Sequence, residues 1–301
     1  MTVRCSKVRF PCSDREGEGG ECVGDLYLPP ATRPAPVVVM AHGLGAQRSF
    51  GLDRFALRFA DRGLAVLVFD YRHLGESPGE PRNLVVPSRQ LEDYRAALRW
   101  VRSEPRVDGG RVALWGTSFS GGHVLVLGAE EGARIRAIVS QIPFVSGISS
   151  ALAFPLRYHV PAIALGLLDT VAGRVGASPL TTPVARPRGL AVLPGGESYE
   201  GYESLVPAGA QGPGRLPARV FLSILTYRPI SIVRQVTVPT LIIAARDDRI
   251  IPIRGVRRAA ARIPDCRLEE WPIGHFELYA GDWFERAVSL EADFLAERLQ
   301  A

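Results

Sequence analysis

Short apolar runs alternate along the chain with longer segments whose apolar residues recur at helical spacing. Apolar runs of this kind are typical of strands that are buried on both faces of a parallel sheet. The pattern predicts strands at residues 37–41, 64–69, 111–115, 135–140, 239–245 and 266–271. It predicts helices at residues 49–62, 87–103, 254–262 and 283–299. This alternation is typical of an α/β fold with a mostly parallel sheet, right-handed crossovers and flanking helices.

Two further strands are predicted before this alternation begins, at residues 3–10 and 22–28. The Gly-rich residues 14–20 between them are typical of a hairpin connection. These two strands bring the predicted sheet to about eight strands.

The alternation stops at residues 147–238. Apolar helical pieces lie in this segment at 151–154, 163–171 and 220–225, and a Pro- and Gly-rich middle lies at 179–217. Because plain loops of this length are unusual in a compact domain, we expect residues 147–238 to form a helical cap. The cap would be inserted into an α/β core of residues 1–146 and 239–301, over the carboxyl ends of the strands. Its apolar faces would line a pocket, which favours a substrate with a large apolar part.

The predicted strand that ends at Trp115 leads into Gly116-Thr-Ser118-Phe-Ser120-Gly-Gly, and an apolar helical run follows. A serine between a buried strand and a helix is typical of a nucleophile elbow, where small residues two before and two after the serine let the backbones approach. The helix N-terminus offers N–H groups to a developing oxyanion. We therefore predict Ser118 as a nucleophile. The overlapping pattern around Ser120 leaves that residue as an alternative.

A His42-Gly43-Leu44 step follows the predicted strand at residues 37–41. The backbone N–H groups of Leu44 and Phe119 are the expected donors of an oxyanion hole. We expect the His42 side chain to shape the turn rather than to take part in chemistry.

A serine hydroxyl needs a base, and the imidazole that serves as base needs an acid to orient it. The chain supplies Asp248 in an Asp-Arg-Ile-Ile-Pro turn after a late strand, and His275 in a Gly-His loop after the final strand. Asp247 stays open as an alternative acid, whereas the residues after the strand at 135–140 offer no carboxylate.

The remaining polar residues near the predicted site have structural interpretations. We expect Asp70 and Arg72 to hold a loop, His73 to be an ordinary residue of that loop, and His123 to pack beneath the elbow. His159 lies in the predicted cap and is a candidate substrate contact.

Charge and hydropathy argue against several other classes of protein. The 301 residues include 36 Lys and Arg and 31 Asp and Glu, for a formal net charge of +5. Lys7 is the only lysine, and the scattered arginines form no basic run, so we expect no nucleic-acid partner. The N-terminus lacks an apolar leader, and the longest apolar stretch, 160–171, is too short to span a bilayer. We therefore expect a cytoplasmic protein without a membrane partner.

The four cysteines are Cys5, Cys12, Cys22 and Cys266. They form no Cys-x-x-Cys pair, and no histidine lies at metal-ligand spacing from them, so we expect no metal site. Free thiols are expected, with a Cys12–Cys22 bridge as the alternative. The sequence leaves the oligomeric state open.

Taken together, these motifs resemble the α/β-hydrolase superfamily, over the chain from about Val8 to the end apart from the cap. The motifs that carry the resemblance are His42-Gly43, Gly116-Thr-Ser118-Phe-Ser-Gly-Gly, Asp248-Arg-Ile-Ile-Pro252 and Gly274-His275-Phe. Gly24-Asp-Leu-Tyr-Leu-Pro and Phe69-Asp-Tyr-Arg resemble the dienelactone-hydrolase-like and peptidase-like bacterial branch. That branch includes relatives that act on polyketide thioesters as thiohydrolases or acyl transferases. The resemblance implies a Ser118–His275–Asp248 triad, an oxyanion hole of Leu44 and Phe119, and no cofactor. Ser120 departs from the family pattern, which usually has Gly there.

Several functions fit these residues. The first is a serine hydrolase that cleaves an ester, lactone or thioester bond of a largely apolar small molecule through an acyl-enzyme. The same residues would serve an acyltransferase or a cyclase, in which an alcohol or amine replaces water. A serine aminopeptidase would need cap carboxylates to hold a substrate amine, and Glu197, Glu200 and Glu203 are available. A non-catalytic binding protein of the same fold is the remaining alternative.

Overall fold

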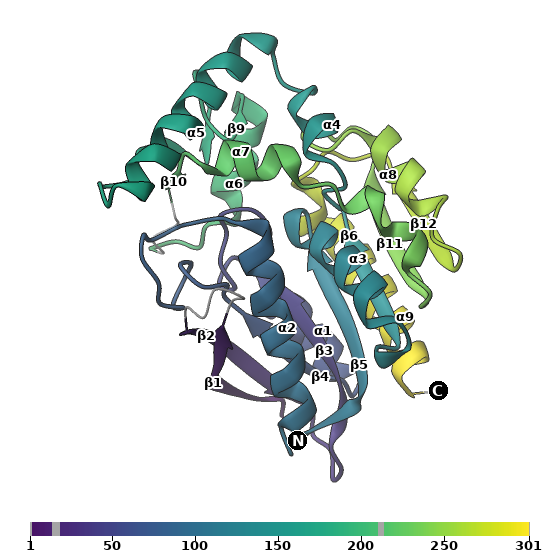
Figure 1. Ribbon diagram of the computed structural model, residues 1–301. Coiled ribbons are helices and arrows are strands. Elements are labelled where there is room, and N and C mark those ends of the chain that lie inside the picture. The colour runs from purple at the N-terminus through teal and green to yellow at the C-terminus, as the bar shows by residue number, and fades with distance from the viewer. Residues whose placement is uncertain (1, 14–18, 210–213, 301) are drawn as a thin grey trace.

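An eight-stranded sheet runs through the molecule (Figure 1). The computed structural model describes residues 2–13, 19–209 and 214–300. In spatial order the strands are β1 (Arg4–Ser13), β2 (Gly19–Leu28), β4 (Ala65–Phe69), β3 (Ala35–Ala41), β5 (Val107–Thr117), β6 (Ala137–Gln141), β11 (Thr240–Ala245) and β12 (Cys266–Trp271). β1 and β2 pair antiparallel, β2 and β4 pair antiparallel, and every other pair is parallel. The predicted α/β fold with a mostly parallel sheet of eight strands is confirmed.

Helices cover both faces of this sheet. α2 (Pro87–Ser103), α3 (Phe119–Glu131) and α8 (Ile253–Ala260) pack on one face, and α1 (Leu52–Asp61) and α9 (Gly281–Gln300) pack on the other. Side chains alternate between the faces along each strand. Val37 and Val39 of β3 accordingly join one core, whereas Val38 and Met40 join the other. This double burial explains why the central strands are apolar throughout.

Most of the predicted elements lie within a few residues of the observed ones. The helix predicted at 49–62 begins only at Leu52, because Gly51 before it has a left-handed backbone with φ of 78°. The strand predicted at 135–140 is β6 at 137–141, because a short 3₁₀ helix occupies residues 132–134. The predicted hairpin link falls partly on residues 14–18, which lie outside the described residues.

The chain between β6 and β11 adds no strand to the large sheet in its described part. Its helices form a layer at one end of the sheet in Figure 1: α4 (Gly147–Ala151), α5 (His159–Arg174), α6 (Gly196–Leu205) and α7 (Val220–Thr226). Short strands lie between them: β7 (Thr181–Pro183), β8 (Ala185–Arg186), β9 (Leu193–Pro194) and β10 (Arg215–Pro217). The helical pieces expected at 163–171 and 220–225 lie inside α5 and α7, whereas residues 152–154 form a turn.

No helix in the described ranges is both long enough and apolar enough to cross a bilayer.

Candidate active site

Ser118 stands alone between the end of β5 at Thr117 and the start of α3 at Phe119, with φ of 55° and ψ of −113°. A non-glycine residue in this region is strained by about 1–3 kcal/mol and persists only where its surroundings hold it. Here the Ser118 N–H donates to the Gln141 carbonyl at 2.9 Å, and the Ser118 carbonyl accepts from the Phe144 N–H at 2.8 Å. The turn therefore holds the serine side chain clear of both elements, as a nucleophile elbow requires.

Gly116 lets the strand and the helix cross at this turn. A Cβ atom at position 116 would lie 2.3 Å from the Ser120 carbonyl oxygen, closer than any side chain tolerates. The sequence argument for small residues around the serine thus has a direct steric cause.

Ser118, His275 and Asp248 form one continuous line of hydrogen bonds. His275 Nε2 lies 3.1 Å from Ser118 Oγ, and His275 Nδ1 lies 2.7 Å from Asp248 Oδ2. The other Asp248 oxygen accepts from the backbone N–H groups of Ile250 and Ile251, at 2.7 and 2.8 Å. This turn fixes the carboxylate, and a carboxylate that accepts from Nδ1–H leaves the lone pair of Nε2 facing the serine hydroxyl. The arrangement is chemically suited to removing a proton from Ser118.

The two alternative residues lie elsewhere. Ser120 Oγ is buried and shares a short hydrogen bond with the Tyr71 hydroxyl, which ties the elbow to the loop after β4. Asp247 is exposed to solvent, and its backbone N–H donates to the Ile273 carbonyl. Of the predicted candidates, the structure brings together Ser118, Asp248 and His275.

The loop after β3 lies directly against Ser118. A Cβ atom at Gly43 would lie 3.2 Å from Ser118 Cβ, and Leu44 and Phe119 line the same cavity as the serine. His42 Nδ1–H donates to the Gly43 carbonyl at 3.0 Å. Burial lowers the pKa of His42, so this ring is neutral and shapes the turn.

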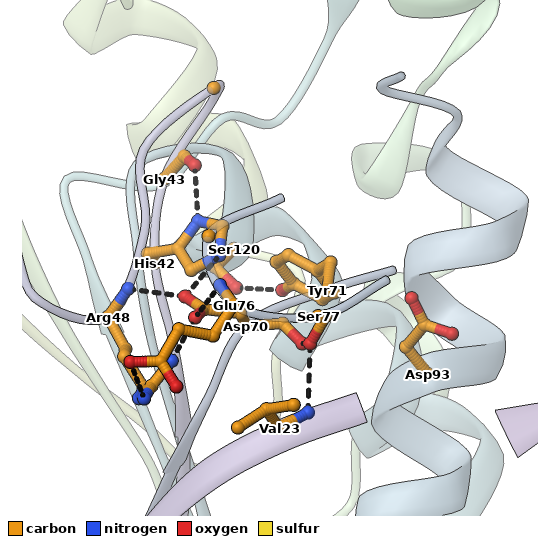
Figure 2. Close-up of polar contacts among 12 residues, drawn as sticks. Val23, His42, Gly43, Arg48, Asp70, Tyr71, Glu76, Ser77, Asp93 and Ser120 are labelled. Carbon is orange, nitrogen blue, oxygen red and sulfur yellow. Dashed lines mark hydrogen bonds and ion pairs between the residues drawn. The ribbon is translucent and has the colours of Figure 1, made fainter. Parts of the chain in front are cut away.

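A buried ionic cluster holds the loop after β3 in place (Figure 2). Asp70 accepts from the Arg48 backbone N–H at 2.7 Å, and its carboxylate also pairs closely with the Arg48 guanidinium. Arg48 Nε donates in addition to Asp25 at 2.7 Å, and the Glu76 backbone N–H donates to Asp70 at 3.0 Å. Ser77 Oγ donates to the Asp70 carbonyl at 2.7 Å. Asp70 therefore holds the loop, as expected. Arg48 could not be predicted for this cluster, because no linear spacing links it to its partners.

Arg72 has the loop-holding role that was expected for it. Its backbone N–H donates to one Asp93 oxygen at 2.9 Å and its Nε to the other at 2.5 Å. His73 is buried in the same loop, at a positive φ of 71°.

His123 packs beneath the elbow on α3. Its Nδ1 accepts from the Tyr227 hydroxyl at 2.7 Å, and its Nε2–H donates to Gln90 Oε1 at 3.0 Å. Burial lowers the pKa of His123 to about 3, so the ring stays neutral and connects α3 to α2 and to the end of α7.

An apolar cavity of about 280 Å³ opens above Ser118. Its walls come from the residues that follow β3, β5, β11 and β12, and from the segment between β6 and β11. His159 and Tyr158 of that segment line it, and His159 Nε2–H donates to the Ala151 carbonyl at 2.9 Å. The cavity thus lies at the carboxyl ends of the parallel strands, the usual ligand position in such sheets.

Cys12, Cys22 and Asp93 form a separate buried cluster whose ligand atoms lie close together. The two sulfur atoms are 3.3 Å apart, and both thiols are free. Because the Asp93 carboxylate is already paired with the Arg72 guanidinium, a cation bound here would face a fixed positive charge. The cluster therefore fits buried thiols better than a metal site.

The fold and this site define the class of protein. A mostly parallel sheet with helices on both faces, and Ser, Asp and His gathered in that chain order at its carboxyl end, are the features of an α/β hydrolase. The family model described as X-Pro dipeptidyl-peptidase (S15 family) matches residues 19–174, slightly more than half of the chain. The chain belongs to this family within the α/β-hydrolase superfamily.

Known relatives agree with this assignment. The Quorum-quenching protein AidA of Acinetobacter baumannii is 39% identical over 276 residues, which cover 91% of this chain and 90% of that protein. Thiohydrolase aneE of Aspergillus aculeatus is 27% identical and matches over 98% of this chain and 93% of its own. The crystal structure of the α/β hydrolase GrgF from a Penicillium species superposes with a TM-score of 0.84 at 22% identity, over 99% of this chain and 100% of the other. That structure shows the fold alone, whereas the family assignment rests on the family model and on the 39% identity to AidA.

Proposed function

We propose that the protein is a serine hydrolase that cleaves an ester, lactone or thioester bond of a largely apolar small molecule. The observation that carries this proposal is the line of hydrogen bonds from Ser118 Oγ through His275 to Asp248, which ends in an apolar cavity. The serine hydroxyl thus lies within hydrogen-bond distance of its proposed base.

The proposed reaction passes through an acyl-enzyme. Ser118 Oγ attacks the carbonyl carbon while His275 Nε2 accepts the hydroxyl proton, and Asp248 stabilises the imidazolium that forms. The N–H groups of Leu44 and Phe119 stabilise the oxyanion. The histidine then gives its proton to the leaving oxygen or sulfur. A water molecule, deprotonated by the same histidine, hydrolyses the acyl-enzyme and regenerates the serine.

The apolar walls of the cavity favour a substrate with an apolar acyl group. Residues 147–238 supply many of them, including Leu152, Phe154, Ile163 and Phe221. We propose that this segment acts as a cap over a core of residues 1–146 and 239–301. The relative named as a thiohydrolase is the reason to include acyl thioesters among the test substrates, beside esters and lactones.

An acyltransferase is the second candidate, because an apolar cavity excludes water and leaves room for another acceptor. Relatives named polyketide transferases, such as af380 of Aspergillus fumigatus at 26% identity, favour this candidate. An aminopeptidase is less well supported, because Glu197, Glu200 and Glu203 are exposed on α6 and none of them lines the cavity.

Mass mapping after fluorophosphonate treatment tests the proposal. We expect one adduct, on Ser118, and much slower labelling of the His275→Ala variant. An adduct on Ser120, or none in the folded protein, would contradict the proposal. Product analysis of an acyl thioester with and without an added alcohol or amine then separates hydrolysis from acyl transfer.

A further inference from the structure

A broad apolar surface lies on the outer side of α5. Eleven large apolar side chains are exposed in the described part of the chain, and ten of them lie between residues 148 and 180. On α5 they include Val160, which is 76% exposed, and Leu168, which is 60% exposed. Ile163, Leu167 and Val171 are exposed on the same helix. We call this surface, from Ile148 to Leu180, the α5 face.

Contacts on the opposite side of α5 fix which side of the helix faces solvent. The Asp169 carboxylate is fully buried and accepts from the Arg219 N–H and the Leu180 N–H, at 2.8 and 2.9 Å, and it pairs with the Arg219 guanidinium. Gly166 lies against Leu222 of α7, where an added Cβ would come within 3.0 Å. Figure 1 accordingly shows α7 on the inner side of α5, and no helix or strand of the described residues on the opposite side in this view. The apolar residues are therefore exposed as a consequence of how α5 is held.

The charged side chains that are exposed between residues 148 and 188 are all basic. Asp169 is the one acidic residue between positions 147 and 196, and it is buried. Arg157 and Arg174, just before and at the end of α5, are exposed, and neither has a carboxylate partner among the residues that the structure describes. Arg186 and Arg188 are exposed on the following segment. An apolar helix face with cationic ends is typical of helices that lie in the interface of an anionic bilayer.

The α5 face is continuous with the catalytic cavity. Ile148, Leu152 and Ile163 are exposed to solvent and also line the cavity above Ser118. An acyl chain leaving a bilayer under α5 would therefore remain in contact with apolar side chains on its way to the serine.

We propose that the α5 face docks on an anionic lipid surface, from which apolar acyl substrates enter the cavity. The delivery of substrate rests on the proposed function, whereas the docking does not. Lying on a surface needs no spanning segment, so the length argument that led us to expect no membrane partner does not exclude it. A second copy of the chain fits the face less well. In a symmetric pair of α5 helices, parallel or antiparallel, an arginine of one copy would meet an arginine of the other.

Co-sedimentation of the full chain with vesicles tests the docking. We expect binding to vesicles of phosphatidylcholine with phosphatidylglycerol, and weaker binding to phosphatidylcholine alone. The double variant Arg157→Gln/Arg174→Gln should lower the partition coefficient roughly 30-fold, because each basic residue near an anionic bilayer strengthens binding about fivefold. Leu167→Glu/Leu168→Glu should abolish binding. Leu57→Glu, which changes a 41% exposed leucine on α1, is the matched control and should bind normally.

Two outcomes would overturn the docking. One is a monomer that binds neither kind of vesicle. The other is a dimer by light scattering that does not bind vesicles and that Leu167→Glu/Leu168→Glu converts to a monomer, which would assign the face to a second copy. The Ser118→Ala variant separates the two proposals, because it should still bind vesicles even if the proposed reaction is wrong. Circular-dichroism spectra and melting temperatures that match those of the wild type show that the α5 variants remain folded.

Discussion

The buried carboxyl group of Glu291 should make the free energy of unfolding depend on pH. This α9 residue is fully buried behind β5, where one of its oxygens accepts from Trp115 Nε1–H at 2.9 Å. Its other oxygen has no hydrogen-bond partner in the described part of the protein. Burial raises the pKa of Glu291 from 4.5 to about 8, which means that the folded protein keeps this carboxyl neutral near neutral pH.

The sign of the effect follows from proton linkage. Between pH 4.5 and 8 the folded protein retains a proton that the unfolded chain has lost, so the free energy of unfolding falls as the pH rises. At about 1.4 kcal/mol per unit, the loss attributable to Glu291 is about 3 kcal/mol between pH 4.5 and pH 7. It approaches about 5 kcal/mol above pH 8, where both states are ionised.

Glu291→Gln removes the titration and keeps an oxygen that accepts from Trp115. Urea unfolding of both proteins at pH 5 and at pH 7 gives the two free energies of unfolding. We expect the free energy of unfolding of the variant, minus that of the wild type, to be about 2–3 kcal/mol more positive at pH 7 than at pH 5. Glu297→Gln, on the exposed side of the same helix, is the control and should leave the pH dependence unchanged. A difference between wild type and Glu291→Gln that stays constant with pH would refute the reasoning.

Three other changes test the site and its surroundings. Ser120→Gly leaves the buried Tyr71 hydroxyl without its partner and should lower the free energy of unfolding by about 1–3 kcal/mol, measured by urea unfolding, and an unchanged value would contradict this role. Asp248→Asn should lower kcat by roughly 10⁴-fold in ester hydrolysis while the melting temperature changes little, and near-normal turnover would remove Asp248 from the proposed triad. Iodoacetamide should alkylate the exposed Cys5 in the folded protein but Cys22 only after unfolding, because burial raises the pKa of the Cys22 thiol, and peptide mapping that finds Cys22 modified first would disprove it.

The sequence was most informative where the relevant residues are contiguous. The elbow from Gly116 to Ser120 is one strand–turn–helix unit, so the steric demands that shape it act between neighbours in the chain. Asp248 could be placed because it follows a strand that is almost wholly apolar, whereas the strand before His275 carries three charged residues and was placed by its position after a predicted helix. Parallel strands end at the same edge of the sheet, which brings such residues together without any further information.

Polar contacts between residues far apart in the chain could not be predicted from the sequence. Arg48 contacts Asp25, Asp70 and Glu76, which lie up to 28 residues away along the chain, and no periodicity records such a cluster. The helix α6 was also not predicted. It lies inside the Pro- and Gly-rich middle of the segment, and it begins with two glycines and a polar stretch that give little indication of a helix.

The segment containing α5 shows a different limit. Apolar residues occur around most of this helix, so the sequence could indicate that it packs on something but could not say which side would do so. Only the contacts made by Gly166 and Asp169 reveal that one side is held by α7 and by Arg219. The exposed side is therefore a property of the tertiary structure and not of the sequence pattern.

Phe119 connects this outer helix to the proposed chemistry. Its backbone is the proposed oxyanion donor, and its ring packs edge-on against His123, Phe144 and Tyr227, with ring centres 4.9, 5.1 and 5.5 Å away. Tyr227 follows the last residue of α7, and α7 is the helix on which α5 rests. Interlocked aromatic rings and the buried hydrogen bond between Tyr227 and His123 resist independent movement, so the Phe119 ring and α5 both pack against α7 or the residue that follows it. An acyl chain that displaced α7 would therefore alter the proposed oxyanion site.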